Sequence, residues 1–549
     1  MSILLAALAL LQSPLDERSP SSLAFVGVHV LPMDTERVLR DQTVLVVGGR
    51  IARVGPVAEV ELPAGTQRIE GRGRFLIPGL VDSHVHVYDE GDLFVYVANG
   101  ITTVRNLMGL PWHLELRERI AAGEIVGPRL VTAGPFVNEP QQRTVEDVQR
   151  AVSEQVEAGY DCIKIHGPLS LAAYQGLLEE AALAGIPVVG HVPRNLPIER
   201  VLELHGQAEI SHGEEYLYTY FDRSPDNTKP ESIAAIAAAT AAAGIAVTPN
   251  LVAFRSIVRQ IEDLGRELAR PEMAWVAPPF GRSWKPDLNR YRRDFEAADA
   301  EPMAARYALL ERLTKALAAA GVRLRAGSDA MNPGAVPGFS LHEELELLVA
   351  AGLTPYQALR AATASAGEFL GHGGDEVAGV VAEKARADLV LLAANPLEDI
   401  ARTRALEGVL LRGRWFPKEE LAQGLAERAR DYAREEPFMG RIDAAGIEAA
   451  LAYRRELRAQ DPHAFVFRPE GIEALVFVYL SLGDPRVARQ AGEVAVEEFP
   501  ARWTAWSRLG EAWAALGDKP AARAALERAL ELHPGDARLA RALADVKSD

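Results

Sequence analysis

Asp82-Ser83-His84-Val85-His86 is the stretch of sequence that decides the fold prediction. It follows the apolar run Phe75-Leu76-Ile77-Pro78-Gly79-Leu80-Val81, which is typical of a buried β-strand. Because side chains at positions i and i+2 of a strand share a face, His84 and His86 are expected to point into one cavity. Neutral imidazole is the commonest protein ligand of metal ions, so the stretch indicates a metal site. For two isolated histidines, the alternative is one buried ring and one solvated ring.

The chain after Gly79 alternates between strand-like and helix-like patterns. Stretches rich in Ala, Leu and Glu, such as residues 145–158 and 171–184, are predicted helices. The predicted strands between them are residues 79–86, 102–106, 129–133, 161–166, 186–191, 208–212, 246–251 and 322–328. Because parallel strands need crossover helices, these alternations predict a closed (β/α)₈ TIM barrel within residues 77–375. An open doubly wound sheet is the alternative.

Side chains that bind metal ions stand at the ends of five of the predicted strands. They are His84, His86, Lys164, His191, His212 and Asp329. In a barrel the carboxyl ends of all strands converge on one face, which is where enzymes of this architecture carry out their chemistry. The pattern therefore predicts a single metal centre built from these six side chains.

This set of motifs resembles the amidohydrolase superfamily of metal-dependent hydrolases. The resemblance extends from about residue 23 to about residue 415. The motifs that carry it are Gly79-Leu80-Val81-Asp82-Ser83-His84-Val85-His86, Gly100-Ile101-Thr102-Thr103-Val104-Arg105, Ile163-Lys164-Ile165, Gly190-His191, Ile210-Ser211-His212-Gly213 and Gly327-Ser328-Asp329. Because Lys164 stands on the fourth predicted strand, the chain most resembles the imidazolonepropionase-like subgroup. This subgroup includes prolidases and other hydrolases of dipeptides and N-acyl amino acids.

The resemblance implies that Lys164 is carbamylated by CO₂ and joins two divalent metal ions. An unmodified lysine is cationic at neutral pH and would repel the ions, which agrees with the need for a carbamate. Zn²⁺ suits imidazole and oxygen ligands, and Mn²⁺, Co²⁺ or Fe²⁺ could use the same ligands. A salt-bridged lysine is the alternative. The implied ligands besides Lys164 are His84, His86 and Asp329 for one ion, and His191 and His212 for the other.

The activity implied by the resemblance is hydrolysis of an amide bond by a hydroxide that two metal ions activate. Asp329 would accept a proton during attack and pass it to the leaving amine, or else be only a metal ligand. The expected substrate is small, such as an Xaa-Pro dipeptide or an N-acyl amino acid. His166 and Arg105 are candidate substrate-binding residues. The alternatives are that His166 is a packed histidine and that Arg105 forms a salt bridge beneath the barrel rim.

Two other functions stay open at this point. The same metal site could cleave a lactone or a phosphoester. Alternatively, the barrel could be catalytically silent and the protein could be an interaction scaffold.

Residues on either side of the predicted barrel form two further regions. Short β-type runs between residues 21 and 76 predict small strands. The resemblance implies that they combine with residues 376–416 in one composite β-sandwich domain. An aromatic-containing stretch at residues 254–301, between the seventh and eighth predicted strands, is expected to be a lid or a wall of the substrate pocket, or to form a small core of its own.

Residues 417–549 are predicted to be helical and lie outside the resemblance to a hydrolase. Two repeats within about residues 469–536, one regular and one degenerate, are fewer than the three that usually suffice for stability. The region is therefore expected to pack on the barrel or on a second subunit; a protein-binding groove is the alternative. The residues at tetratricopeptide spacing are Trp506, Leu509, Gly510, Trp513, Ala522, Leu526, Ala529 and Pro534.

Composition and charge bear on compartment and partners. The net charge is −17 and no basic run contains interleaved aromatic residues, so nucleic acid is not an expected partner. Cys162 is the single cysteine, which excludes an intramolecular disulfide and a multi-cysteine metal site. Residues 3–11 are too short to span a bilayer but resemble the apolar core of a signal peptide, so residues 1–20 are predicted to be a leader and the protein to be exported. A cytoplasmic protein with a short N-terminal helix is the alternative.

Overall fold

The computed structural model of the chain describes residues 22–370, 377–461 and 469–547. The chain divides into two compact units. The first contains the described residues up to Val87 together with Leu93–Glu262 and Ala297–Leu425; the second contains Tyr88–Asp92, Asp263–Glu296 and the described residues from Ala426 onward. None of the described helices combines the length and the apolar character that crossing a bilayer requires. The predicted leader, residues 1–20, lies outside the described residues.

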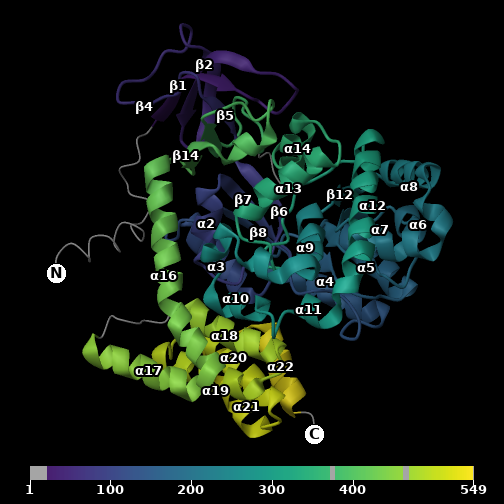
Figure 1. Cartoon of the computed structure of the whole chain (residues 1–549), viewed down its shortest axis with the longest axis vertical. Helices are drawn as coiled ribbons and strands as arrows, with labels where there is room; N and C mark the ends of the chain where they lie inside the picture. Colours follow the sequence, from purple (N-terminus) through teal and green to yellow (C-terminus); the bar gives the residue numbers. More distant parts are fainter. Residues whose placement is uncertain (1–21, 371–376, 462–468, 548–549) are drawn as a thin grey trace. The chain divides into compact units, whose positions relative to one another are not determined.

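An eight-stranded sheet in the first unit is built from two distant parts of the sequence (Figure 1). Strand β13 (Leu389–Leu392) pairs antiparallel with β5 (Phe75–Pro78), so that Val390 lies opposite Ile77. The pairing lies within one hydrogen-bonded sheet, so residues from both sides of the predicted barrel combine in one β structure, as the resemblance implies. In sheet order the strands are β15 (Arg414–Pro417), β14 (Leu406–Leu411), β13 (Leu389–Leu392), β5 (Phe75–Pro78), β1 (Ser22–Val30), β2 (Leu39–Val47) and β3 (Arg50–Pro56), with β4 (Gln67–Glu70) beside β1.

Two parallel sheets form the rest of the strand structure of the first unit, with helices between the strands. The predicted alternation of strand and helix is confirmed. The three-stranded sheet contains β6 (Leu80–Val85), β7 (Ile101–Asn106) and β8 (Arg129–Thr132); the four-stranded sheet contains β9 (Ile163–Ile165), β10 (Val188–Gly190), β11 (Gln207–Ser211) and β12 (Ala246–Thr248). The helices between them are α2 (Asp92–Ala98), α3 (Pro111–Ala121), α4 (Val145–Ala158), α5 (Leu171–Ala184), α6 (Ile198–Glu203), α7 (Glu214–Thr219) and α8 (Pro230–Ala243).

Local sequence signals set the ends of the helices that precede β9 and β10. The Thr144 side chain accepts a hydrogen bond from Asp147 N at the start of α4, and Ser170 caps α5 in the same way. Gly159 and Gly185 end the two helices at φ 85° and 69°, a left-handed conformation that glycine adopts without steric penalty. Each helix therefore stops a few residues before the next strand begins.

The predicted eighth strand, residues 322–328, does not form a regular strand. Leu324 makes a single parallel bridge to Val247, and Ala330 makes one to Val85. Asp329 has φ 56°, and a residue in the left-handed region cannot continue a β-ladder. A further isolated bridge joins Ala133 of the three-stranded side to Cys162 of the four-stranded side. The closed barrel therefore stays a prediction.

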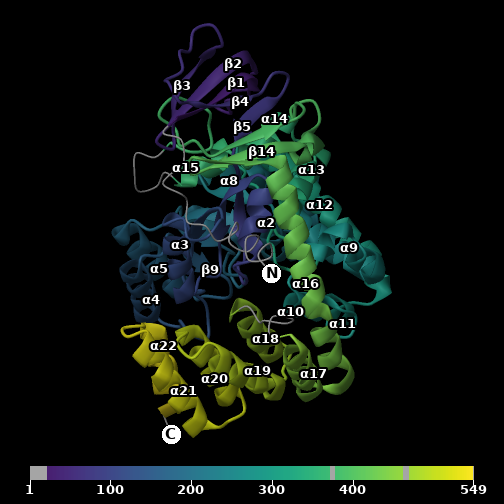
Figure 2. The ribbon, with the colours of Figure 1, turned by 90° about the vertical axis from the view of Figure 1, so that its left-hand side faces the viewer.

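The second unit contains most of the C-terminal helices, which lie side by side from α18 (Pro469–Ser481) to α22 (Ala537–Lys547) (Figure 2). The pairs α18–α19 and α20–α21 correspond to the predicted degenerate and regular repeats, with the period of about 34 residues that the motif has. A Cβ atom at Gly510 would lie 2.7 Å from Leu526 Cγ, so α20 and α21 need glycine there to pack closely. The helices are α16 (Lys418–Ala445), which crosses the boundary between the units, α17 (Ile447–Gln460), α18 (Pro469–Ser481), α19 (Pro485–Glu498), α20 (Trp503–Ala515), α21 (Lys519–Leu532) and α22 (Ala537–Lys547).

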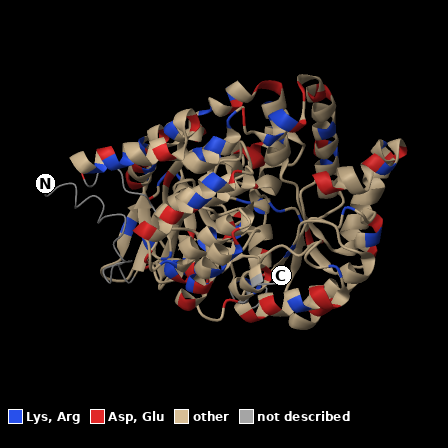
Figure 3. Cartoon of the chain, turned by 90° about the horizontal axis from the view of Figure 1, so that it is seen from below, with Lys and Arg blue, Asp and Glu red and all other residues tan. Residues whose placement is uncertain are grey.

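Lys and Arg are interspersed with Asp and Glu along the helices (Figure 3). In α21, Arg523 pairs with Glu527 at 2.8 Å and Arg528 pairs with Glu531 at 2.8 Å. Exposed pairs at this spacing contribute only about 0.3–0.5 kcal/mol each. The helices of the repeats are therefore held together mainly by their buried Ala and Leu side chains, such as Ala522, Leu526 and Ala529.

Candidate metal centre

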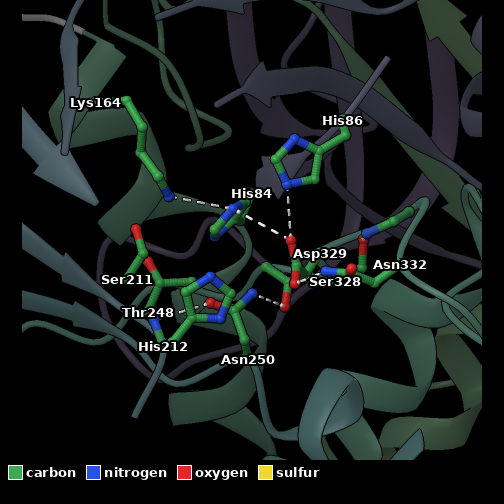
Figure 4. A network of polar contacts seen from close by, with 12 residues as sticks. His84, His86, Lys164, Ser211, His212, Thr248, Asn250, Ser328, Asp329 and Asn332 are labelled. Carbon is green, nitrogen blue, oxygen red and sulfur yellow. Dashed lines mark hydrogen bonds and ion pairs between the residues drawn. The ribbon is translucent and has the colours of Figure 1, made fainter. Parts of the chain in front are cut away.

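The six predicted metal ligands lie in one cluster in the first unit. Figure 4 shows His84, His86, Lys164, His212 and Asp329. Asp329 Oδ1 lies 3.0 Å from His86 Nε2 and 3.3 Å from His84 Nε2. Lys164 Nζ lies 3.4 Å from His84 Nε2. The His212 ring is centred 4.6 Å from the His84 ring and 4.6 Å from the His191 ring. Residues far apart in sequence thus converge where their strands end.

Unusual backbone conformations aim three of the side chains at or beside the centre. His212, Asn250 and Asp329 have φ values of 69°, 52° and 56°, and such left-handed conformations cost about 1–3 kcal/mol for residues other than glycine. Asn250 supports its neighbours, because its Oδ1 accepts from His212 N at 3.2 Å and its Nδ2 donates to Gly327 O at 2.8 Å. Hydrogen bonds therefore hold the strained backbone in place.

Glycines make room for two of the predicted ligands. A Cβ atom at Gly190, which has φ 110°, would lie 2.4 Å from Lys164 Cδ. A Cβ atom at Gly327 would lie 2.9 Å from His84 Cβ. Contacts this short exclude any other residue without displacement of the backbone or of the ligands. Gly190 and Gly327 therefore fix the paths of Lys164 and His84.

Burial sets the protonation of the cluster. It lowers the pKa values of His84, His191 and His212 well below the usual range for histidine, so these rings are neutral and can donate a lone pair. Burial also lowers the pKa of Lys164 to about 8. For Asp329, burial acts in the opposite direction, but His212 and His86 outweigh it and hold the pKa at about 2.

The donor set fits a divalent metal ion. Ligand atoms of His84, His86 and Asp329 all lie within 4.8 Å of one another. His84 Nδ1 is buried and has no hydrogen-bond partner in the described part of the chain. Two imidazoles and one carboxylate are a common ligand set for zinc. The geometry therefore supports a metal site formed by His84, His86 and Asp329. Lys164, His191 and His212 lie beside this site.

Glu215 is a residue of the site that the sequence analysis missed. It lies in the first turn of α7, and its side chain is fully buried. Glu215 Oε1 lies 2.7 Å from His191 Nδ1 and accepts a hydrogen bond from Arg194 at 2.6 Å. A carboxylate on the remote nitrogen of a metal-binding histidine fixes the ring's tautomer and orientation. The one sequence feature that points to Glu215 is its position three residues after His212.

Substitution of Glu215 by Gln is expected to weaken metal binding or activity by about 10- to 100-fold, because an amide is a weaker acceptor for His191 Nδ1–H. Metal titration of the purified protein followed by activity measurement checks this expectation. Glu214→Gln is the matched control. It makes the same chemical change at the neighbouring position, but it alters an ion pair with Arg194 (3.6 Å) rather than the hydrogen bond to His191. Equal metal affinity in Glu215→Gln and the wild type would contradict the role given to Glu215.

Asp82 attaches the irregular eighth segment to β6. Its carboxylate accepts hydrogen bonds from Ser328 N at 2.9 Å and from Ser328 Oγ at 2.5 Å. Burial raises the pKa of Asp82 to about 7 despite these donors. Because Ser328 directly precedes Asp329, this pair places the carboxylate of Asp329 opposite His84 and His86.

The two candidate substrate-binding residues have different surroundings. His166 is exposed, stacks on Phe136 with ring centres 4.4 Å apart, and lies 4.8 Å from the His191 ring. Its position next to the cluster is compatible with the predicted role. Arg105 is only 1% exposed, forms a salt bridge with Glu209 and donates to Ser83 O at 2.7 Å. Arg105 therefore occupies the buried salt bridge that was its alternative, and it is not retained as a substrate-binding residue.

Comparison with known proteins places this cluster in a family. Curated relatives match over short segments, and the chain spans about a sixth of their length. The adenine deaminase of Paracoccus denitrificans (strain Pd 1222) is 37% identical over 92 residues, which are 16% of this chain and 15% of that protein. The solved structure of bottromycin amidohydrolase is 28% identical, with a TM-score of 0.61 over 78% of this chain and 94% of that one. A Xaa-Pro dipeptidase structure shares the fold at 18% identity, with a TM-score of 0.56 over 72% of this chain and all (100%) of that one.

Family models match both of the regions that the sequence analysis distinguished. The model described as amidohydrolase family covers residues 75–416, which include all six clustered side chains. The model described as tetratricopeptide repeat covers residues 475–537. The chain therefore belongs to the amidohydrolase family and carries a tetratricopeptide repeat region near its C-terminus.

Proposed function

We propose that this protein is a metal-dependent enzyme that hydrolyses an amide bond in a small substrate, such as an Xaa-Pro dipeptide or an N-acyl amino acid. The observation that carries the proposal is the convergence of His84, His86 and Asp329 beside Lys164. The names of two structural neighbours, an amidohydrolase and a dipeptidase, add support for a carbon–nitrogen bond as the target.

Two divalent ions, with Zn²⁺ as the first choice, form part of this proposal. His84, His86 and Asp329 would hold one ion, and His191 and His212 would hold the other. Lys164, as a carbamate formed with CO₂, would supply the oxygen atoms that join the sites. Bound ions of this kind polarise a carbonyl group and lower the pKa of water. The neutral rings of His84, His191 and His212, and the buried path that Gly190 leaves for Lys164, support this proposal.

Asp329 is the proposed proton acceptor during attack on the amide. Its low pKa means that the carboxylate is ionised in the resting protein. Asn332 Nδ2 donates to its Oδ2, which leaves Oδ1 directed at His84 and His86. A carboxylate held in this way can take a proton and then deliver it to the leaving amine, acting first as a base and then as an acid.

We further propose that the strands of the first unit close into an eight-stranded barrel. The isolated bridges Val85–Ala330, Val247–Leu324 and Ala133–Cys162 support this, because they join the segments in the cyclic order that closure requires. Closure would bring the carboxyl ends of all the strands to one rim, where side chains of a barrel active site gather.

A substrate panel tests the proposed activity directly. Metal-loaded protein is incubated with Xaa-Pro dipeptides, N-acyl amino acids, lactones and aryl phosphotriesters, and Asp329→Asn prepared in parallel reports contaminating hydrolases. Turnover of the dipeptides or N-acyl amino acids, absent from the variant, is the expected result. Faster turnover of lactones or phosphotriesters would mean that the enzyme cleaves one of those groups instead of an amide. No turnover of any substrate in the panel would favour a catalytically silent barrel.

A further inference from the structure

The second unit joins the C-terminal helices to two segments that come from elsewhere in the chain. An aromatic stack forms one part of this junction. The Tyr88 ring lies between two phenylalanine rings: it is 5.0 Å from Phe280 at 23° and 5.3 Å from Phe477 at 28°. The guanidinium carbon of Arg508 lies over the Phe477 ring, 5.2 Å from the ring centre. Helices α18 and α20, the first helix of each repeat, thus each contribute a side chain to the stack.

Polar contacts from α16 reinforce the junction. Asp443 forms an ion pair with Arg282, whose side chain is only 10% exposed, and lies 3.8 Å from Lys285 Nζ. Glu436 forms a second ion pair with Lys285 at 3.0 Å. Tyr432 Oη donates to the buried Asp92 at 3.2 Å. Both segments are therefore held by the C-terminal region through apolar and polar contacts together.

The first segment directly follows a part of the chain that builds the candidate metal centre, and the second lies in the connection between Asn250 and Asp329. Tyr88 follows His86 by two residues, and β6, which contains His84, ends at Val85. Arg282 and Lys285 lie in or directly after α10 (Pro278–Trp284), between α9 (Leu251–Leu268) and α12 (Ala300–Ala319). The residues that hold them, from Tyr432 to Arg508, lie beyond the part of the chain that matches the amidohydrolase family.

We propose that the C-terminal repeat region acts within its own chain as a positioning element for the amidohydrolase centre. Phe477 of the repeats, together with Asp443 of α16, fixes residues 88–92 and 278–287, and Tyr88 extends this restraint to the backbone that follows His86. The inference rests on the proposed function for its catalytic consequence. The face of α18 and α20 that bears Phe477 and Arg508 is occupied by Tyr88, so an external peptide could use that face only by displacing Tyr88.

Hydrogen exchange on the full-length protein tests this inference. Phe477→Ala removes the ring that contacts Tyr88, and backbone amides of residues 88–92 and 278–284 are expected to exchange about 10-fold faster, because opening of a segment becomes easier when its packing is lost. Phe477→Tyr, which keeps the ring and can direct its hydroxyl to solvent, is expected to restore slow exchange. Phe499→Ala is the matched control, since Phe499 packs against the apolar cluster of helices α16 to α20 and is not one of the rings of the stack.

Steady-state kinetics with metal-loaded protein supply the second readout. Phe477→Ala is expected to lower kcat/KM about 10-fold at unchanged metal content, whereas Phe499→Ala keeps the wild-type value. Equal exchange in Phe477→Ala and Phe499→Ala, or wild-type kinetics in Phe477→Ala, would overturn the inference. A wild-type protein with no amide turnover would defeat the proposed function instead, and hydrogen exchange, which needs no substrate, would still decide whether the repeats hold the two segments.

Discussion

Substitution of Asp329 by Asn is expected to lower kcat/KM for amide hydrolysis by about 10³-fold. The amide removes the negative charge that faces His84 and His86, and it cannot take up a proton at neutral pH. The introduced amide would also face Asn332, whose own amide donates to the carboxylate in the wild type. Steady-state kinetics of the metal-loaded variant, with metal content measured on the same sample, check this expectation.

Asp161→Asn is the matched control for this experiment. It makes the same change of charge, but Asp161 pairs with Arg117 at 2.9 Å and is 36% exposed. The control variant should keep kcat/KM within about twofold, as surface substitutions usually do. If Asp329→Asn retained more than a tenth of the wild-type kcat/KM, Asp329 would be neither the proton acceptor nor an essential ligand.

Substitution of Lys164 by Ala is expected to remove the group that would join the two metal ions and to reduce activity by about 10³-fold or more. The side chain fills a buried path between Gly190 and His84, so its removal leaves a space that a small anion can enter. Acetate or propionate should therefore restore part of the activity by supplying carboxylate oxygens. The measurement is activity as a function of added carboxylate.

Lys164→Arg separates the carbamate from the alternative of a salt-bridged lysine. Arginine keeps the positive charge but cannot form the carbamate, so the variant should be inactive, and carboxylates should not rescue it because the space is filled. An active Lys164→Arg variant, or near-normal turnover of Lys164→Ala without carboxylate, would remove Lys164 from the mechanism.

The cluster could be predicted from sequence because its residues share one simple rule. His84, Lys164 and His212 each stand at the carboxyl end of a predicted strand, and parallel strands place those ends on the same side of a sheet. The rule requires only that the strands and their direction be recognised. Apolar runs followed by a polar side chain supply both, even though β9 and β10 are only three residues long.

The supporting residues could not be found in the same way. Glu215 and Glu209 are two of 76 acidic residues. Glu215 stands three residues after His212, but its position does not reveal that it is buried against His191, and no signal marks Glu209 as the partner of Arg105. The left-handed conformation of Asp329 was equally hidden, because non-glycine residues adopt it only when tertiary contacts hold them there. For the same reason the eighth segment was predicted as a strand but is joined to its neighbours by single bridges.

The division into units shows a further limit of sequence patterns. The sequence predicts a lid, a pocket wall or a small core of its own at residues 254–301. The structure groups Asp263–Glu296 in one unit with the C-terminal helices, so this stretch has no separate core, and the lid or wall stays a prediction. The reason lies in long-range pairs such as Tyr88 with Phe477 and Lys285 with Glu436, whose partners are far apart in the sequence. Periodicity within a segment carries no information about such pairs.

Metal analysis of the purified protein, combined with removal and return of the metal, tests the central claim most directly. The account predicts about two divalent ions per chain, loss of amide hydrolysis after chelation, and recovery when Zn²⁺ and bicarbonate are returned. Full activity in a chelated, metal-free sample, or failure of the protein to bind any divalent ion through these six side chains, would contradict it.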